Sequence, residues 1–172
     1  MKYRNAILLM LMVSLLSSLA WAQTNVKEQS ARMTLKVKLN YTGAGSVDEK
    51  HKLYVLLFDS NPYTAHTLVD RTSATEPAAA LSAGTDKVCS IIARQATGTN
   101  KRAVTFAKLS VSPVYAMAFY DKSGEYANQG DPPSHVPMGL YGGKPGNPQP
   151  IKLDSGKAVE VELTFGDSAA TP

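Results

Sequence analysis

The sequence contains few cysteines and histidines, the residues that form disulfides and most transition-metal sites. Cys89 is the only cysteine among 172 residues, so no disulfide can form within one chain. Cys89 lies in an apolar run, and we expect it to be a small buried hydrophobic side chain. The three histidines, His51, His66 and His135, are far apart and form no metal-ligand motif, which argues against a local zinc or copper site.

Charge is also sparse and nearly balanced. The chain has 18 Lys and Arg against 14 Asp and Glu, and 19% of its residues are charged. A net charge of +4 is too small for a strongly basic nucleic-acid binder, so we expect no nucleic-acid partner. The hydrophobic content of 44% excludes wholesale disorder. The length suits one domain that folds without a metal or a disulfide.

One apolar run lies at the N-terminus and predicts export. Two basic residues precede the mostly aliphatic stretch 6–19, and Ala20-Trp21-Ala22 then places small residues at −3 and −1 of a cleavage site. We predict a signal peptide over 1–22, cleaved after Ala22, and a periplasmic or secreted mature protein. The run is too short to span a bilayer and no cysteine follows it, so we expect neither a membrane span nor a lipid anchor in the mature chain.

Alternating polarity predicts β-strands along the rest of the chain. In 33–41 and 158–165 every second residue is apolar, as in a strand with one buried face, whereas 51–58 is apolar on both faces at its end, as in a central strand. The predicted strands are 33–41, 51–58, 87–94, 103–108, 114–120, 149–153 and 158–165.

About seven strands without a long amphipathic helix predict an all-β, antiparallel β-sandwich. Only 77–81 suggests a helical turn, and Asp154-Ser155-Gly156-Lys157 suggests a tight hairpin between the last two strands. The expected organisation is a flexible leader over 23–32, one domain over 33–165 and a disordered tail over 166–172.

The segment 121–148 departs from this rhythm. Eleven of its 28 residues are Gly or Pro, and a loop of this length is usually functional or disordered. It also carries apolar and aromatic residues, so we consider an ordered flap over a sandwich edge, a binding loop, or a mobile loop without function. Our candidate ligand-binding residues are Tyr126, His135 and Tyr141, in which the two tyrosines would offer stacking faces to a sugar.

The start of this segment is also a candidate metal loop. Asp121, Ser123 and Glu125 place oxygens at alternate positions, as a calcium loop requires, and Asn128 and Asp131 would add ligands if the loop folds back. The pattern lacks the central glycine and the final bidentate glutamate of an EF-hand. A turn with solvated carboxylates is the alternative interpretation. We expect no cofactor, with calcium as the one candidate.

No motif assigns an enzymatic activity. The chain contains neither a G-x-S-x-G nucleophile motif nor a glycine-rich phosphate loop. We therefore expect a non-catalytic binding or accessory protein of the cell envelope, which binds an envelope component, a carbohydrate or a partner protein through 121–148. The alternatives are a metal-dependent enzyme or metal-binding protein using calcium or a transition metal, and a structural subunit that assembles by β-strand addition.

Several short motifs resemble one family. Val104-Thr105-Phe106 is followed by Leu109 and by Tyr120-Asp121-Lys122-Ser123-Gly124, and the later stretches Pro137–Gly142 and Val161–Phe165 fit the same pattern. In this order the motifs resemble prealbumin-like (transthyretin-like, carboxypeptidase regulatory-like) domains, which include small secreted bacterial proteins of unassigned function. The resemblance implies a β-sandwich and an exported accessory protein, and it supplies no catalytic residue.

Overall fold

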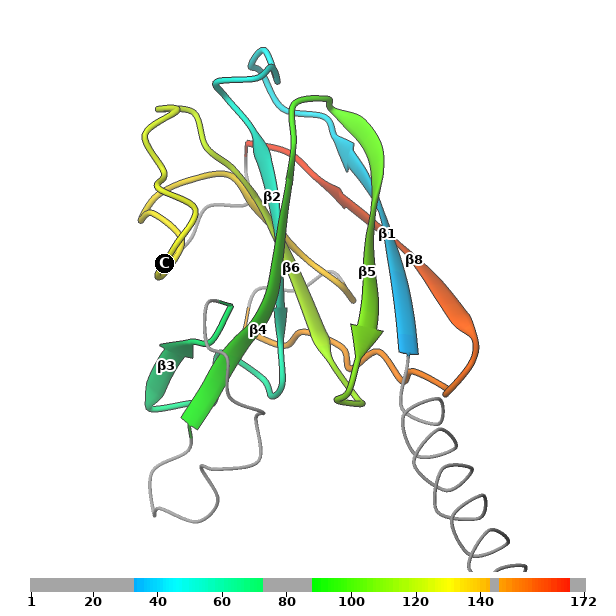
Figure 1. Ribbon diagram of the computed structural model, residues 1–172. Coiled ribbons are helices and arrows are strands. Elements are labelled where there is room, and N and C mark those ends of the chain that lie inside the picture. Colours follow the sequence, from blue (N-terminus) through cyan, green and yellow to red (C-terminus); the bar gives the residue numbers. More distant parts are fainter. Residues whose placement is uncertain (1–32, 73–87, 143–145, 168–172) are drawn as a thin grey trace, which may run out of the picture.

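The computed structural model describes residues 33–72, 88–142 and 146–167, and every regular element in these ranges is a β-strand. Eight strands form one sheet of three and one sheet of five (Figure 1). The all-β, sandwich-like class predicted from the sequence is therefore confirmed. No helix in the described ranges could cross a membrane. The predicted signal peptide, the leader 23–32 and the helical turn 77–81 lie outside the described residues.

The smaller sheet has the strand order β5-β1-β8. Its strands are β1 (Met33–Tyr41), β5 (Lys101–Leu109) and β8 (Ala158–Phe165). The predicted alternation in 33–41 is confirmed, because Leu35, Val37 and Leu39 are buried while the intervening side chains lie toward solvent. Apolar side chains of the three strands form one wall of the core between the sheets.

The larger sheet has the strand order β3-β4-β2-β6-β7. Its strands are β3 (Thr67–Asp70), β4 (Val88–Thr97), β2 (Leu53–Phe58), β6 (Tyr115–Tyr120) and β7 (Met138–Leu140). The predicted central strand is confirmed, because all residues of β2 are buried. Its odd-numbered side chains enter the core between the sheets, and its even-numbered ones, such as Leu56, enter a second apolar cluster.

This second cluster lies on the outer face of the five-stranded sheet. It consists of buried residues from β2, β4, β6 and β7, and of Val136 just before β7. Tyr63 and Ala65, from the connection between β2 and β3, and Tyr126, from the segment after β6, pack against it. Two loops thus cover an apolar sheet face that would otherwise meet water, and the candidate site forms between these loops.

The expected purely antiparallel order is wrong at two edges. β8 pairs with β1 in parallel, with Val161 opposite Val37, and β3 pairs with β4 in parallel, with Val69 opposite Ser90. Alternating polarity fixes which face of a strand is buried but does not encode strand direction. Direction is tied to sequence where a tight hairpin joins two strands, and neither of these pairs is joined by one.

Residues 149–153 do not form the predicted strand. Only Ile151 pairs, in an isolated bridge with Val114 whose N–O distances are 2.8 and 3.0 Å. Pro148 and Pro150 lack the N–H groups that a ladder needs. The turn at Asp154–Lys157 does form, with Lys157 N–H donating to Asp154 O over 3.2 Å, but it does not join paired strands, because β8 pairs with β1.

The strands missed by the sequence are the short ones. β3 has four residues and β7 has three, which is too few to show a period of two. β7 lies inside the segment expected to be irregular from 121 to 148, and it forms the last strand of the larger sheet by pairing with β6. The segment is therefore a loop of two parts separated by a strand.

Candidate functional site

Asp121 follows β6 directly and organises the first turn of the segment. Its side chain is buried, and its carboxylate accepts hydrogen bonds from Ser123 Oγ at 2.7 Å and from the N–H groups of Gly124 and Tyr126, both at 3.0 Å. Burial acts to raise the pKa of Asp121, but these hydrogen bonds outweigh it, and the pKa lies below its ordinary value. The carboxylate is thus a structural acceptor for the turn.

The candidate calcium loop does not form a cluster of carboxylates around Asp121 in the described part of the chain. Ser123 donates its hydroxyl to Asp121, which directs the oxygen into the turn. Glu125, Asn128 and Asp131 are exposed. Across the described ranges, no group of three His, Cys, Asp or Glu side chains is placed to hold a metal ion.

Tyr126 packs onto the outer sheet face by its ring. The ring meets Tyr54 and Phe119 edge-on, with centroid distances of 4.9 and 5.0 Å. Its hydroxyl donates to Gly130 O at 3.0 Å, and the Arg94 guanidinium carbon lies 5.6 Å from its ring centroid. Burial raises the pKa of Tyr126 to about 12. Tyr126 therefore anchors the segment to the sheet.

Arg94 of β4 binds the same segment after β6 through hydrogen bonds from its side chain. Its guanidinium donates to the carbonyl oxygens of Asn128 and Gly130, the latter at 2.8 Å, and to Asp70 at 2.9 Å. Only 2% of the Arg94 side chain is exposed, and its Nε is buried without a partner among the described residues. We call Arg94, Asp70 and residues 128–130 the clasp. Sequence reasoning missed it, because a single arginine in a strand looks like any solvent-facing residue.

Asp70 completes the clasp from β3. It accepts from Gly130 N–H at 2.7 Å and from the hydroxyl and N–H of Thr72 at 2.7 and 3.0 Å. Burial acts to raise the pKa of Asp70, but the bonds from Thr72, Gly130 and Arg94 outweigh it and hold the pKa at about 2. Asp70 is therefore ionised at neutral pH and balances the buried charge of Arg94.

The three candidate ligand-binding residues do not converge. Tyr126 belongs to the outer cluster, whereas Tyr141 packs against the core between the sheets, on the other face of the larger sheet. His135 is exposed in a tight turn with a φ of 59°. Tyr126 and Tyr141 therefore cannot stack on the same sugar in this arrangement.

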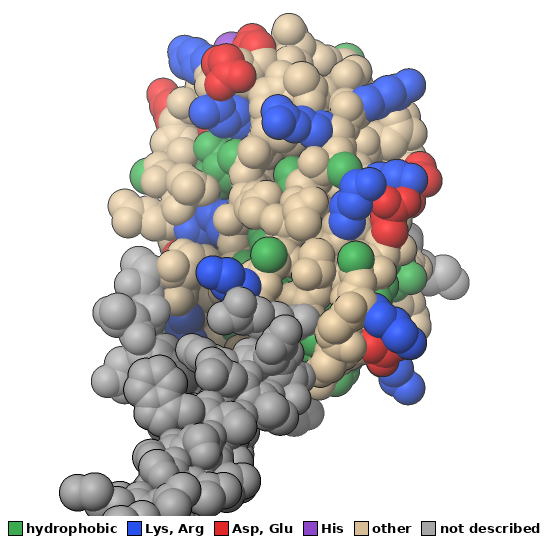
Figure 2. Space-filling model, turned by 45° about the vertical axis from the view of Figure 1, so that its right-hand side comes forward, with side chains coloured by type: hydrophobic (Ala, Val, Ile, Leu, Met, Phe, Trp, Pro, Cys, Tyr) green, Lys and Arg blue, Asp and Glu red, His purple; other side chains and the backbone are tan. Residues whose placement is uncertain are grey.

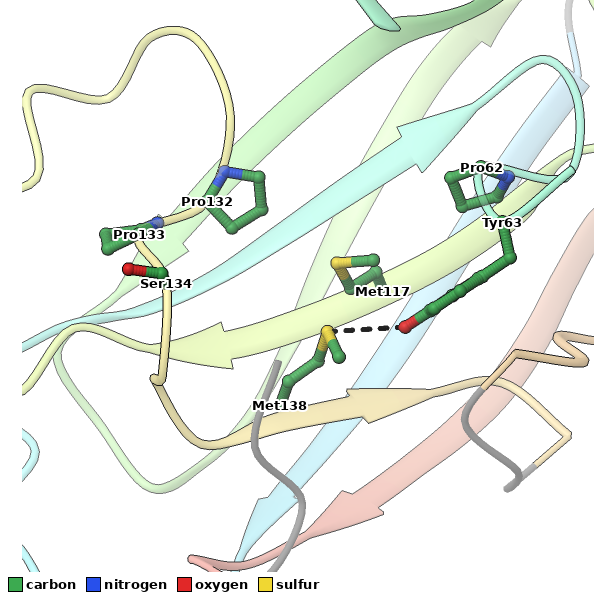
Figure 3. A pocket seen from close by; sticks show the side chains of 7 residues that line it. All are labelled: Pro62, Tyr63, Met117, Pro132, Pro133, Ser134 and Met138. Carbon is green, nitrogen blue, oxygen red and sulfur yellow. Dashed lines mark hydrogen bonds between the residues drawn. The ribbon is translucent and has the colours of Figure 1, made fainter. Parts of the chain in front are cut away.

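A cavity of about 260 Å³ lies on the outer face of the larger sheet, between the two covering loops (Figure 3). One wall comes from the connection after β2, the other from the segment before β7, and Met117 of β6 and Met138 of β7 lie between them. The lining residues are Pro62, Tyr63, Met117, Pro132, Pro133, Ser134 and Met138. The glycine and proline content of 121–148 was the sequence signal for the second wall. No sequence pattern marked Pro62, Tyr63 or Met117 as lining residues of a cavity.

The lining defines what the cavity can bind. None of its residues is charged, and only Ser134 and Tyr63 bring hydroxyl groups. Tyr63 donates its hydroxyl to Met138 Sδ at 3.8 Å, and a thioether is a weak acceptor. A ligand oxygen would be a better partner for this hydroxyl. Methionine side chains adapt their shape and make favourable contacts with aromatic rings.

Cys89 does not add a reactive group to this face. It is fully buried in the outer cluster, as expected for a small hydrophobic side chain, and its thiol donates to Ser60 O at 3.3 Å. Burial raises the pKa of the Cys89 thiol, which disfavours the nucleophilic thiolate.

Comparisons with protein-family models, with curated proteins and with solved structures each found no match to this chain.

Proposed function

We propose that the protein is an exported, non-catalytic binding protein of the cell envelope, and that it holds a partner protein by one large apolar side chain. The observation that carries this proposal is the uncharged cavity between Tyr63 and Pro132-Pro133, with Met117 and Met138 between its walls. The sequence motifs support a prealbumin-like domain, which is consistent with an accessory protein.

The size and chemistry of the cavity favour a side chain over a larger ligand. Its volume of about 260 Å³ lies below the roughly 300–1,000 Å³ of sites for drug-sized molecules. A sugar would need several hydrogen-bonding groups and an open aromatic face. Tyr126, the strongest candidate for such a face, is occupied by Tyr54, Phe119 and Arg94. An aromatic or long aliphatic side chain fits the neutral lining better.

The clasp supports the proposal because it preorganises one wall of the cavity. Arg94 and Asp70 hold residues 128–130 on the sheet, two residues before Pro132. Ordering a loop costs free energy at the moment of binding unless the loop is ordered beforehand. A segment rich in glycine and proline is thus kept in the shape that the cavity needs.

The experiment is site-specific photo-cross-linking in cells that make the protein. A photoreactive residue at exposed Thr64, beside Tyr63, is expected to capture one protein, and Ser134→Lys is expected to abolish the adduct by placing a charge at the rim. The matched control is Ser110→Lys, at an exposed serine outside the cavity, which should leave the adduct intact. Adducts that still form with Ser134→Lys would contradict the proposal that the partner binds in this cavity.

Export is tested independently by N-terminal sequencing of the protein recovered from culture. The proposal expects a chain that begins at Gln23 and is found in the periplasmic or culture-medium fraction. A chain that retains residues 1–22 would contradict export with cleavage.

A second candidate function is a structural subunit that assembles by strand addition. The observation in its favour is β8, an eight-residue edge strand that pairs, among the described strands, only with β1. Sedimentation velocity separates the two candidates, since a subunit forms larger species as the concentration rises and a binding protein does not.

A further inference from the structure

The two outer faces of the molecule differ in chemistry. Figure 2 shows basic side chains with acidic ones among them on the side that carries the smaller sheet, where Lys36 pairs with Glu160 at 2.7 Å. The cavity on the outer face of the larger sheet has no charged lining residue, but it has two methionines, Met117 and Met138. Of the side chains that line it, only these two are readily oxidised by a mild oxidant such as hydrogen peroxide.

The hydroxyl of Tyr63 is directed at one of these sulfurs. It lies 3.8 Å from Met138 Sδ, and Figure 3 shows the two groups pointing toward one another. A thioether accepts hydrogen bonds weakly, whereas a methionine sulfoxide carries a polar oxygen on the same sulfur. Burial raises the pKa of Tyr63, which keeps its hydroxyl protonated and able to donate. Oxidation of Met138 would therefore give this hydroxyl a better partner than it has now.

Hydrogen peroxide can reach Met138 through the cavity. The cavity is open to solvent, and its volume of about 260 Å³ is many times the roughly 10–15 Å³ that one water molecule needs. Met138 is 3% exposed, while Met33, in the core between the sheets, is 7% exposed. Exposure alone thus predicts no faster oxidation of Met138 than of Met33. A preference for Met138 would come from the cavity and from the Tyr63 hydroxyl.

We propose that Met138 is a site of reversible oxidation, at which hydrogen peroxide forms a methionine sulfoxide that accepts a hydrogen bond from Tyr63. The thioether sulfur gives an electron pair to one peroxide oxygen and the O–O bond breaks. The other oxygen takes up the proton of the first and leaves as water. The sulfur loses two electrons and the peroxide gains two, so the step needs no further reactant. Methionine sulfoxide reductases restore the thioether.

The use of this site rests on the proposed function, in which export brings the chain into an oxidising compartment and an apolar side chain of a partner fills the cavity. Tyr63 can bind only part of the sulfoxide oxygen's hydrogen-bonding capacity. The remainder loses its water when an apolar side chain covers the oxygen, and this desolvation opposes binding. The partner therefore binds tightly when Met138 is reduced and at least tenfold more weakly when it is oxidised.

The modification site is tested by peptide mass spectrometry of the folded full chain after brief exposure to hydrogen peroxide. Met138 is expected to gain an oxygen atom at least tenfold faster than Met33. Equal rates at the two residues would overturn the proposal, because they would show that the cavity gives Met138 no advantage.

The hydrogen bond to the sulfoxide is tested by thermal unfolding before and after oxidation. Oxidation is expected to lower the melting temperature of Tyr63→Phe by about 3 °C more than that of the wild type, because the sulfoxide oxygen then lacks its donor. The matched control is Tyr115→Phe, at a tyrosine that packs against the outer cluster but does not line the cavity, and it should respond as the wild type does. Equal responses of all three proteins would contradict the proposed hydrogen bond.

The effect on binding is measured by titrating N-acetyl-L-tryptophanamide into each protein after the peroxide has been removed. Oxidation is expected to weaken binding at least tenfold in the wild type and in Met33→Leu, and to change the affinity of Met138→Leu by less than twofold. An equal loss of affinity in Met138→Leu would overturn the assignment to Met138. If the unoxidised wild type does not bind the probe, the proposed function is contradicted, while the oxidation rates of Met138 and Met33 still decide the modification site.

Discussion

The Arg94 guanidinium lies 2.9 Å from the Asp70 carboxylate, and the side chain of Arg94 is almost fully shielded from water. The pair joins β4 to β3 at one edge of the larger sheet. Both partners also bind Gly130, which lies in the segment between β6 and β7. A charge pair inside the fold thus fixes a loop that has few regular hydrogen bonds of its own.

Replacing Asp70 by Asn is expected to destabilise the protein by about 3 kcal/mol, because the buried charge of Arg94 loses its counter-ion. Urea unfolding measures the loss. Asp154→Asn is the matched control, since Asp154 forms an exposed pair with Lys157 and should change stability by less than about 1 kcal/mol. Equal stability of the two variants would show that the clasp contributes nothing.

The clasp should also weaken in acid. The pKa of Asp70 is about 2 in the folded chain and close to 4 in an unfolded chain. A lowered pKa gives stability that is fully present above pH 4 and is lost as the pH falls through 2. The difference in urea midpoint between the wild type and Asp70→Asn should be constant from pH 5 to pH 8 and should shrink between pH 4 and pH 2. A difference that persists at pH 2 would contradict this.

Tyr126→Phe is expected to cost about 1 kcal/mol, because it removes the hydrogen bond to Gly130 O but keeps the ring between Tyr54 and Phe119. Tyr141→Phe is the control, since Tyr141 packs against the core between the sheets and is not part of the clasp. Limited proteolysis should then cut Tyr126→Phe faster than the control within residues 122–131. Identical cleavage rates would show that Tyr126 does not hold the segment.

Gly139→Ala is expected to destabilise the fold by about 2 kcal/mol through overpacking. A Cβ at Gly139 would lie 2.6 Å from both Leu163 Cδ2 and Phe165 Cβ, which belong to β8. Thermal unfolding measures the effect against Ala158→Ser, which adds an atom at an exposed position on β8. A melting temperature equal to that of the control would mean that β7 and β8 do not approach so closely.

The sequence predicted the faces of the long strands because burial acts on every second residue. The alternation in β1 and in β8 identified the core side of the smaller sheet, and the apolar run in β2 identified a strand buried on both faces. It did not predict the direction in which β8 pairs, since burial is the same for parallel and antiparallel neighbours.

The candidate site was predicted only as a region. The glycine and proline content marked 121–148, but the cavity also needs Tyr63 and Met117, which are far from that segment in sequence. Nothing local distinguishes Arg94 from a solvent-facing arginine, because its role depends on Asp70 and on residues that fold over it. Contacts of this kind exist only in three dimensions.

The most direct test of the proposed binding site follows the methionine methyl groups by NMR while N-acetyl-L-tryptophanamide, a neutral aromatic probe, is added. We predict that the Met117 and Met138 methyl signals shift with saturation, that Met33 in the core between the sheets does not, and that the charged N-acetyl-L-tryptophan binds more weakly. Unmoved Met117 and Met138 signals, or shifts shared equally by Met33, would contradict the account.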